Sequence, residues 1–422
     1  MTDGKIPKRH IVVAMGFLAM LICFLDRVSM STAVLPMAEA YGWSATTKGW
    51  VLSSFFIGYL FAQIPGGWFV NRYGGRAVMG VSLIWWSIAT ILTPISAMAS
   101  LGALIVVRIA MGLGEAAVTP ALYNLAARWL PERERSRSMT IMIGGIPAGT
   151  VVGLSLSGWM ISAHPWPWMF YGFGLIGIVF AYFWYRFVFA SPSVHPTISR
   201  GELELLRAGQ ALSDRDTRGP VPWRNILSKA PVWALIFNHF CSNWSIYVLI
   251  SWLPSYFSAF KTFGMAGVGL SSALPWVILF IVSNLAAIVA DRLVQGGMPL
   301  GRVRKLAQSL GLLGSASFLV IASFSTTPIV GLLALCGGVG MLGCTWSGFA
   351  PNHLEIGPRY ADILSGLTNT AGTLPGIIGV TVTGVIVDLT GGFGAAFQLA
   401  AAINVLGTIV WLLWSTSDRI ID

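Results

Sequence analysis

The sequence predicts an all-α membrane protein with twelve transmembrane helices in two halves of six, and three observations predict it. Only 10% of the 422 residues are Asp, Glu, Lys or Arg, whereas soluble domains carry about 25%. Apolar runs of about 20 residues, long enough to cross a bilayer as a helix, recur along the chain. One long polar interval divides these runs into six and six.

The expected spans are separated by short turns that contain polar residues, Gly or Pro. They are 11–36, 48–70, 77–96, 101–126, 139–162, 167–189, 231–254, 268–290, 304–324, 328–350, 362–387 and 394–416. The first run is too long for the apolar part of a cleavable signal peptide, so we expect it to stay in the protein.

The polar interval 190–230 is expected to be a cytoplasmic loop between an amino-terminal half, 1–189, and a carboxyl-terminal half, 231–422. Within this loop, Ser199 and Glu202 have the spacing of a capping box ahead of apolar residues. That spacing is compatible with a short surface helix, but a tether that lies on the inner membrane face is the favoured interpretation.

Lys and Arg gather in alternate turns, as in the run Arg133, Arg135 and Arg137. Short basic loops stay cytoplasmic, so both termini are expected on the cytoplasmic side. This topology accounts for the net charge of +10, and no nucleic-acid partner is expected. The four cysteines fall within expected spans without CxxC spacing, so neither a disulfide framework nor a metal site is predicted. No cofactor is expected.

Four charged residues interrupt the expected spans: Asp26 and Arg27 in the first, and Arg108 and Glu115 in the fourth. Each costs roughly 2.5 to 3.5 kcal/mol at the centre of a membrane helix, and such residues mark transport pathways. Two positive and two negative groups neutralise one another if they share a cavity. An anion that enters this cavity then needs a proton or a cation with it, which is the outline of symport.

Arg108 and Glu115 are seven residues apart, and therefore lie on one helical face about 10.5 Å apart along the axis. Asp26 and Arg27 point about 100° apart. Guanidinium groups match carboxylate and phosphate oxygens, so Arg27 and Arg108 are expected to hold an anion. Asp26 and Glu115 are expected to carry protons. The alternative is that Arg108 and Glu115 are a structural pair that bridges helices, and that Asp26 and Arg27 are a pair near the inner helix end or facing a vestibule.

The carboxyl-terminal half offers Asn369, in the Gly- and Pro-containing stretch "GLTNTAGTLPGIIG", as a hydrogen-bonding partner for the substrate. Kinked helices commonly expose polar groups to a transport cavity. Tyr59, Asn243 and Tyr247 are further candidates to line the site. Packing of helices through small residues is the alternative explanation of the glycines.

Several stretches together resemble the anion:cation symporter family of the major facilitators. They are "SSFFIGYLFAQIPGGWF", "RIAMGLGEAAVTPALYNLAARWLPERERSRS", "FNHFCSNWSIYVLISWLPSYF" and "APNHLEIGPRYADILSGLTNTAGTLPGIIG". The family includes sialin, vesicular glutamate transporters, type I sodium-phosphate transporters, plastid phosphate transporters and bacterial galactonate and hexuronate symporters. The resemblance implies the major facilitator fold, with two halves that rock about a site near the midplane.

The resemblance also implies roles for individual residues. Arg27 is similar to the family's substrate-anion arginine, Asp26 and Glu115 to its protonatable acids, and Arg108 to the partner of Glu115. Tyr59 and Asn369 fall on positions that line the family's central cavity.

Departures from the family pattern bear on the substrate and the location. Vesicular glutamate transporters carry an arginine where this chain has Ser242, and a histidine near Leu52, so glutamate of the vesicular kind is not expected. A length of 422 residues without a presequence rich in Ser and Arg resembles the bacterial members. A monomer in a bacterial plasma membrane is expected.

The function predicted is proton-coupled symport of a small organic anion, such as a sugar acid or another carboxylate. The alternative is transport of inorganic phosphate with sodium or protons. A membrane enzyme that uses His239, or His353 in a cytoplasmic loop, as a base is disfavoured, because no nucleophile or metal-ligand cluster accompanies either histidine. A non-transporting sensor is the remaining alternative.

Overall fold

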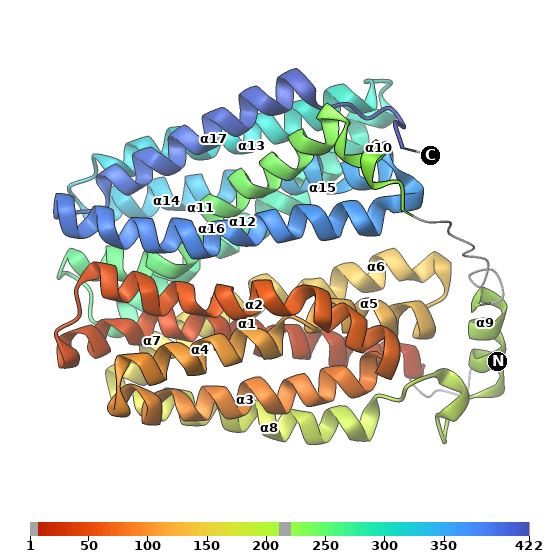
Figure 1. Cartoon of the computed structure of the whole chain (residues 1–422), viewed down its shortest axis with the longest axis horizontal. Helices are drawn as coiled ribbons and strands as arrows, with labels where there is room; N and C mark the ends of the chain where they lie inside the picture. Colours follow the sequence, from red (N-terminus) through yellow and green to blue (C-terminus); the bar gives the residue numbers. More distant parts are fainter. Residues whose placement is uncertain (1–6, 211–220, 422) are drawn as a thin grey trace. The chain divides into compact units, whose positions relative to one another are not determined.

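The computed structural model describes residues 7–210 and 221–421, which form helices joined by short loops and contain no strand (Figure 1). The helices before the polar interval are α1 (Lys8–Tyr41), α2 (Ala45–Tyr73), α3 (Gly75–Ala99), α4 (Leu101–Glu115), α5 (Val118–Trp129), α6 (Glu132–Ile143), α7 (Gly145–Ala163) and α8 (Pro167–Phe187). The interval holds η1 (Pro192–Val194), α9 (Arg200–Gln210) and α10 (Trp223–Leu227). It is followed by α11 (Ala230–Ala259), α12 (Met265–Gln295), α13 (Leu300–Ser323), α14 (Pro328–Leu342), α15 (Thr345–Ile356), η2 (Pro358–Tyr360), α16 (Ala361–Thr390) and α17 (Gly394–Trp414).

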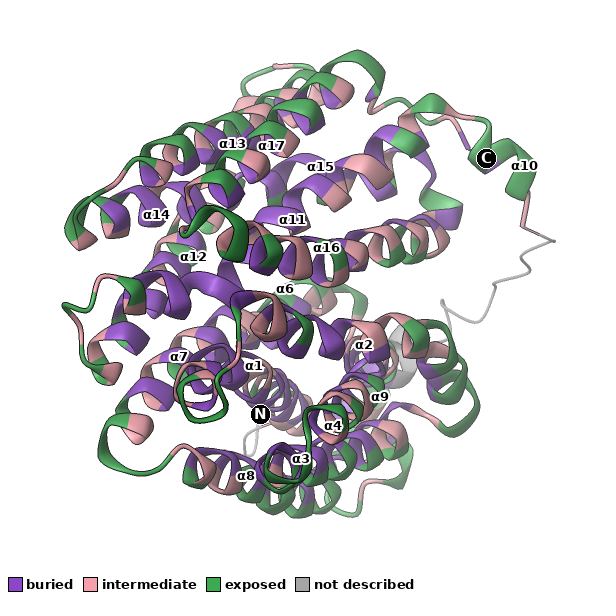
Figure 2. Ribbon diagram, turned by 60° about the vertical axis from the view of Figure 1, so that its left-hand side comes forward, coloured by how far each residue is buried: buried purple, intermediate pink, exposed green. Residues whose placement is uncertain are grey.

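The prediction of twelve spans is confirmed. Among the described residues, ten helices or consecutive helix pairs are long and apolar enough to cross a membrane. The other two spans are α2 and α11, with 29 and 30 residues. Figure 2 shows that buried residues lie where helices face one another and that exposed residues cover the outward faces. Many of these exposed residues are large and apolar, as expected of helix faces that contact lipid.

Three expected spans, 101–126, 139–162 and 328–350, are each formed by two consecutive helices: α4 and α5, α6 and α7, and α14 and α15. Pro120 and Pro147 lie in the first turns of α5 and α7. Proline has no N–H to donate to the carbonyl four residues earlier, so it favours a break there. The apolar run continues across each break, and hydropathy therefore does not reveal it.

The described residues pack as two compact units, which are treated separately below. Unit 1 comprises described residues of Met1–Ser29, Ile57–Gly153 and Pro165–Pro220, and unit 2 those of Met30–Phe56, Leu154–His164 and Val221–Asp422. Helices α1, α2 and α7 contribute to both units. The expected domain boundaries stay a prediction, and residues 211–220 of the expected loop lie outside the described part of the chain.

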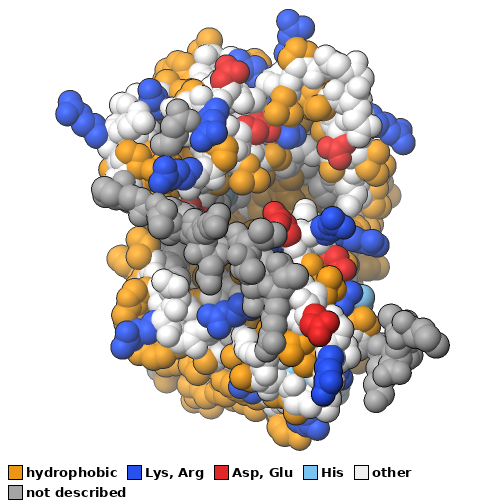
Figure 3. Space-filling model, turned by 90° about the vertical axis from the view of Figure 1, so that its right-hand side faces the viewer, with side chains coloured by type: hydrophobic (Ala, Val, Ile, Leu, Met, Phe, Trp, Pro, Cys, Tyr) orange, Lys and Arg blue, Asp and Glu red, His pale blue; other side chains and the backbone are white. Residues whose placement is uncertain are grey.

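In unit 1, residues Arg200–Gln210 form a helix, α9, so the capping-box alternative is confirmed over the expected tether. The Ser199 hydroxyl accepts a hydrogen bond from the backbone N–H of Glu202 at 3.2 Å. The Glu202 carboxylate in turn accepts the backbone N–H groups of Lys8 and Arg9, both at 3.0 Å, so α9 is fixed to the start of α1. Figure 3 views the face that carries α9, and Lys and Arg side chains are spread over it.

In unit 2, the end of α16 is fixed to the start of α2. The Asp388 carboxylate accepts the backbone N–H groups of Ala45 at 2.9 Å and Thr46 at 2.7 Å. A negative group at a helix N-terminus satisfies free N–H donors and complements the helix dipole. Further along the same two helices, Thr381 Oγ1 donates to Ser53 Oγ at 3.0 Å.

A row of glycines on α7 seats α1 in unit 1. Gly145, Gly149 and Gly153 recur at every fourth position and so lie on one face. A Cβ added at Gly149 would collide with the Leu21 carbonyl oxygen, and one at Gly153 would lie 2.9 Å from the Leu25 Cα. The backbone of α1 therefore lies directly against α7. This contact lies just before Asp26 and Arg27, the two charged residues of α1.

The contact at Gly149 predicts that adding one methyl group there lowers the stability of the protein. Gly149→Ala is expected to lower the free energy of unfolding by about 1 to 3 kcal/mol, because overpacking must move one helix. Thermal unfolding in detergent, followed by tryptophan fluorescence, measures the effect.

Gly67→Ala is the matched control, because a Cβ there meets nothing within 4 Å and alanine favours helix. Its unfolding temperature is expected to equal or exceed that of the wild type. Equal stability of both variants would contradict the close packing of α1 on α7.

Candidate functional site

Four charged side chains lie together in unit 1, on α1 and α4. Asp26, Arg108 and Glu115 are 0%, 2% and 1% exposed, and the Arg27 side chain is 9% exposed. Asp26 is close enough to Glu115 and Arg108 to interact with both coulombically. The structure thus brings the four predicted residues into one cluster with two charges of each sign.

An ion pair between Arg27 and Glu115 is the strongest contact in this cluster. Glu115 Oε2 accepts from Arg27 Nη2 at 2.8 Å and from Nε at 3.0 Å. The Cys23 thiol donates to the same oxygen at 3.2 Å. The second oxygen, Oε1, is buried and has no hydrogen-bond partner among the described residues. The hydrogen bonds from Arg27 and Cys23 to this carboxylate therefore all go to Oε2.

Two aromatic rings hold the Arg27 guanidinium. Its central carbon lies 4.4 Å from the centre of the Phe24 ring and 4.9 Å from that of Tyr59. Arginine is weakly hydrated and stacks well on aromatic faces. The close approach of α2 to α4 brings Tyr59 here, since a Cβ at Gly58 would collide with the Ile109 carbonyl oxygen. Arg27 is thus held in place while remaining the most exposed of the four charged groups.

Asp26 has a different environment from its neighbour on α1. Trp86 Nε1 on α3 donates to Asp26 Oδ2 at 3.1 Å. Oδ1 is buried, and the described residues offer it no hydrogen-bond partner. An ionised carboxylate buried with so few donors is costly, and a neutral carboxylic acid is much less so. This geometry favours a proton on Asp26.

Arg108 lies deeper than Arg27. Its Nη1 contacts the Met111 sulfur at 3.1 Å, and its charge acts on both Asp26 and Glu115. A 2% exposed side chain is poorly placed to meet a substrate directly. The position favours an electrostatic role, in which Arg108 offsets the carboxylates of the cluster.

The resemblance implied that Arg108 is the partner of Glu115, and the charge of Arg108 does act on Glu115. Glu115 also accepts hydrogen bonds from Arg27, a pairing that the resemblance did not imply. Sequence reasoning also missed two contacts, from Cys23 and Trp86. Cys23 is one helical turn before Arg27, a spacing that places both on one face. Nothing in the sequence connects Trp86 with Asp26.

The predicted residues of the carboxyl-terminal half lie in unit 2. Asn243 Nδ2 on α11 donates to the Gly372 carbonyl on α16 at 2.8 Å. The Tyr247 ring packs on Phe56, with ring centres 4.6 Å apart. Asn369 lies one turn before Thr373, whose hydroxyl donates to the Asn369 carbonyl at 2.9 Å. Asn243 and Asn369 thus lie on the two neighbouring helices α11 and α16.

The prediction that His353 lies in a cytoplasmic loop is wrong. It lies within α15 and is 7% exposed. Nδ1 is 2.8 Å from the Ala350 carbonyl oxygen, and Nε2 is 2.8 Å from Thr368 Oγ1. The turn formers Pro351 and Gly357 flank this histidine in the sequence, but the helix continues through Pro351 to Ile356.

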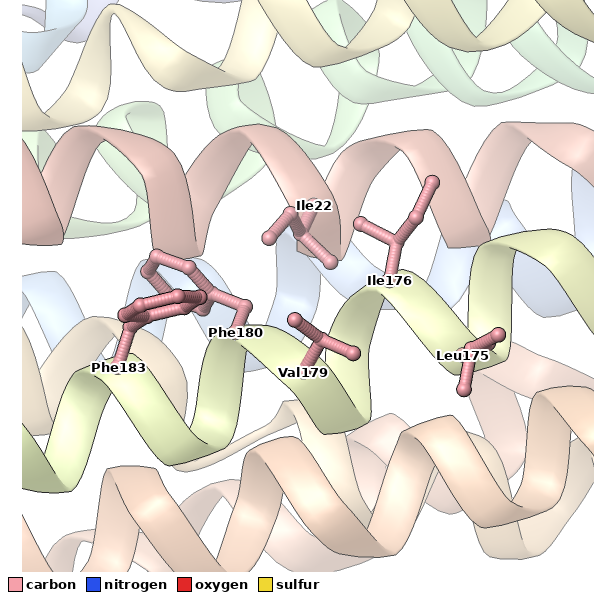
Figure 4. Close-up of a pocket in the computed structure, with 6 residues that line it drawn as sticks. All are labelled: Ile22, Leu175, Ile176, Val179, Phe180 and Phe183. Atoms are coloured by element: carbon pink, nitrogen blue, oxygen red, sulfur yellow. The ribbon is translucent and has the colours of Figure 1, made fainter.

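An apolar pocket in unit 1 is separate from the charged cluster. Figure 4 shows that one residue of α1 and five of α8 line it. They are Ile22, Leu175, Ile176, Val179, Phe180 and Phe183. No lining side chain offers a hydrogen bond to an anion, so this pocket suits hydrocarbon and is not the candidate substrate site.

The Trp86–Asp26 hydrogen bond gives a testable prediction. Trp86→Phe is expected to lower the free energy of unfolding by about 1 to 3 kcal/mol, because it leaves a buried acceptor unsatisfied. In a double-mutant cycle with Asp26→Leu, which removes the acceptor, part of this loss should disappear. Thermal unfolding of the four proteins in detergent measures the coupling.

Trp184→Phe is the control for this cycle. Trp184 is equally buried, and its Nε1 donates to the Arg76 backbone carbonyl at 3.0 Å. The loss of unfolding free energy in Trp184→Phe should simply add to the loss in Asp26→Leu. Strict additivity in both cycles would show that the indole does not stabilise Asp26.

A family model described as Major Facilitator Superfamily matches residues 16–380. Three curated relatives are plant proteins. "Probable anion transporter 4, chloroplastic" of Oryza sativa subsp. japonica is 42% identical, covering 99% of this chain and 70% of the relative. "Ascorbate transporter, chloroplastic" of Arabidopsis thaliana is 41% identical, with 99% and 77% covered. "Sodium-dependent phosphate transport protein 1, chloroplastic" of Arabidopsis thaliana is 41% identical, with 99% and 81% covered.

Solved transporter structures share the fold. The xylose transporter XylE from E. coli, in an inward-open conformation, superposes with a TM-score of 0.78 at 15% identity, covering 97% of this chain and 96% of that one. A bacterial homolog of the human lysosomal transporter Spinster gives 0.76 at 16% identity, with 98% of each chain covered. The relatives and the family are transporters and not enzymes. The plant relatives are chloroplastic, so the comparisons do not support the expected bacterial plasma membrane.

Proposed function

We propose that this chain, which belongs to the major facilitator superfamily and to the anion transporters within it, carries a small organic anion together with a proton. The proposed substrates are sugar acids or other carboxylates, moved by alternating access. The observation that carries this proposal is the Arg27–Glu115 ion pair, in which the most exposed cation of the cluster is held by an almost fully buried carboxylate.

The Glu115 carboxylate and the substrate anion compete for the Arg27 guanidinium. A guanidinium fork binds carboxylate or phosphate oxygens in the same way as it binds Glu115. When a substrate anion engages Arg27, the hydrogen bonds from Arg27 to Glu115 Oε2 weaken or break. Glu115 is 1% exposed, and an ionised carboxylate that loses its partner at such a place is strongly destabilised.

A proton on Glu115 removes this penalty. The anion and the proton are therefore expected to bind together: the anion frees Glu115 from Arg27, and the proton neutralises Glu115. The cluster then gains one negative and one positive charge, and its net charge does not change. That balance supports symport with one proton per monovalent anion at this residue.

Asp26 is proposed as a second proton-carrying group. Among the described residues its carboxyl group accepts one hydrogen bond, from Trp86, and Arg108 and Glu115 are nearby. Tyr59, Asn243, Tyr247 and Asn369 complete the proposed set of residues that contact the anion. Arg108, the other proposed substrate-binding residue, is proposed to act on the anion electrostatically.

Inorganic phosphate remains the second candidate substrate, because one relative is named as a sodium-dependent phosphate transport protein. Another is named as an ascorbate transporter, which favours an acidic sugar derivative. Arg27 suits the oxygens of either anion. We further propose that the protein acts as a monomer with both termini on the cytoplasmic side, on the basis of its basic loops.

Uptake into proteoliposomes tests the substrate and the driving ion. Radiolabelled ascorbate, a panel of sugar acids and phosphate are offered under imposed proton, sodium or voltage gradients, with protein-free liposomes as the blank. Accumulation of an organic anion driven by an inward proton gradient is the expected result. Accumulation of phosphate alone, driven by sodium, would replace the proposal with its alternative.

A further inference from the structure

A polar face on α11 extends beyond the residues considered so far. His239, Asn243 and Tyr247 recur at every fourth position, so their side chains lie on one face of the helix. All three are partly exposed, whereas Asn238 and Ser242 on the adjacent side of the helix are buried. The interior of unit 2 therefore leaves this face open to contact.

The buried side of α11 is fixed by a closed hydrogen-bond network. Gln308 Nε2 on α13 donates to Asn238 Oδ1 at 3.0 Å and lies 3.3 Å from Ser242 Oγ. Gln308 Oε1 accepts the backbone N–H of Phe349 at 3.2 Å. Satisfied buried networks of this kind rigidify the elements that they join. The network holds α11 and the backbone of Phe349 in a fixed relation.

His239 is held between Phe349 and α16. The two ring centres lie 4.9 Å apart. On its other side, a Cβ added at Gly372 would lie 2.7 Å from His239 Cδ2 and 2.9 Å from Nε2. The same Cβ would lie 2.9 Å from Asn243 Nδ2. The absence of a side chain at Gly372 thus lets the imidazole and the Asn243 amide lie side by side.

His239 and His353 differ in their hydrogen bonds. Both ring nitrogens of His353 have an oxygen at 2.8 Å, from Ala350 and Thr368. His239 Nδ1, in contrast, is buried and has no partner among the described residues. Buried polar atoms are nearly always paired in native structures, so an unpaired one indicates a missing partner.

We propose that His239 contacts the transported anion and that the imidazole Nδ1, which has no partner among the described residues, donates a hydrogen bond to an anion oxygen. This inference rests on the proposed function and extends its binding site to a residue that was not assigned there. Imidazole N–H and amide N–H groups are donors that suit a carboxylate or phosphate oxygen. The neighbouring titratable group is His353 on α15, and it carries no negative charge. The facing residue of α16 is Gly372.

The test measures binding and stability in the same variants. Binding of radiolabelled ascorbate and phosphate to purified protein in detergent gives Kd, and tryptophan fluorescence gives the unfolding temperature. His239→Phe keeps a ring against Phe349 and removes both nitrogens. Its Kd for the anion that the wild type binds is expected to rise about tenfold or more, the effect of losing a hydrogen bond to a charged group. Its unfolding temperature should be close to that of the wild type.

His353→Phe is the matched control. It removes two satisfied hydrogen bonds, so it should lower the unfolding temperature while Kd changes less than twofold. Gly372→Ala is a second probe, since its Cβ displaces the imidazole and the amide without changing either. It is also expected to raise Kd. An unchanged Kd in both His239→Phe and Gly372→Ala would overturn the assignment.

These experiments distinguish a failure of the proposed proton coupling from a failure of the role proposed for His239. If the wild type binds an anion but proton gradients drive no uptake, the proposed proton coupling fails, while the Kd comparison still decides the role of His239. If the wild type binds neither ascorbate nor phosphate, the assignment of His239 to such an anion is overturned as well.

Discussion

Arg27→Lys is expected to weaken anion binding by about 10- to 150-fold, which corresponds to the loss of about 1.5 to 3 kcal/mol from charge-assisted hydrogen bonds. Lysine keeps the positive charge beside Glu115, but it lacks the planar fork that binds two oxygens at once. It also stacks less well between the Phe24 and Tyr59 rings. Kd for the transported anion, measured on purified protein, reports the loss.

Arg27→Ala alone is less informative, because it leaves Glu115 as an unpaired buried charge, which costs about 3 to 5 kcal/mol. The double variant Arg27→Gln with Glu115→Gln avoids this cost and should fold without binding the anion. Arg9→Lys is the matched control, since Arg9 also forms ion pairs, with Glu134 at 2.9 Å and with Glu202 at 3.3 Å. Arg9 does not belong to the charged cluster, so Kd should stay within twofold. Wild-type affinity in Arg27→Lys would exclude a direct contact with the anion.

Glu115→Gln is expected to abolish proton-driven accumulation while leaving anion exchange intact. Glutamine resembles the protonated glutamic acid in shape and hydrogen bonding, but it cannot release a proton. The carrier is then fixed in the form that binds anion, and exchange of labelled for unlabelled anion needs no change of protonation. Two assays on the same proteoliposomes measure the difference: net uptake under an inward proton gradient, and counterflow without a gradient.

The companion variant Glu355→Gln distinguishes coupling from general damage. Glu355 accepts a hydrogen bond from Arg304 Nε at 2.7 Å in unit 2. The variant therefore loses an ion pair comparable to the one between Arg27 and Glu115. Net uptake and counterflow should decrease together in this variant, if they change at all. Equal loss of both activities in Glu115→Gln would mean that this carboxylate is structural.

The sequence was sufficient for the fold because each span carries its own signal. Apolar length marks a membrane helix without reference to its neighbours. The capping spacing at Ser199 pointed to α9 in the same local way, although a tether was favoured there. The helix breaks near Pro120 and Pro147 were missed, since hydropathy continues across them. His353 was misplaced because the expected span ended at residue 350, whereas the helix continues through Pro351 to Ile356.

The candidate site was only partly predictable. Charge within a span identified Asp26, Arg27, Arg108 and Glu115, because hydrocarbon makes such residues conspicuous. Their pairing was not predictable, since the spacing of Arg108 and Glu115 fixes a shared face but not a contact. Arg27 reaches Glu115 from another helix, and such contacts depend on tertiary packing.

Simultaneous measurement of proton and anion entry tests the central claim most directly. Proteoliposomes that contain the pH-sensitive dye pyranine are given the radiolabelled anion in sodium-free buffer, with membrane voltage clamped by potassium and valinomycin. The account predicts that the lumen acidifies as the anion enters, and that Glu115→Gln exchanges anion without acidification. Anion entry without acidification in the wild type, or a strict requirement for sodium, would contradict it.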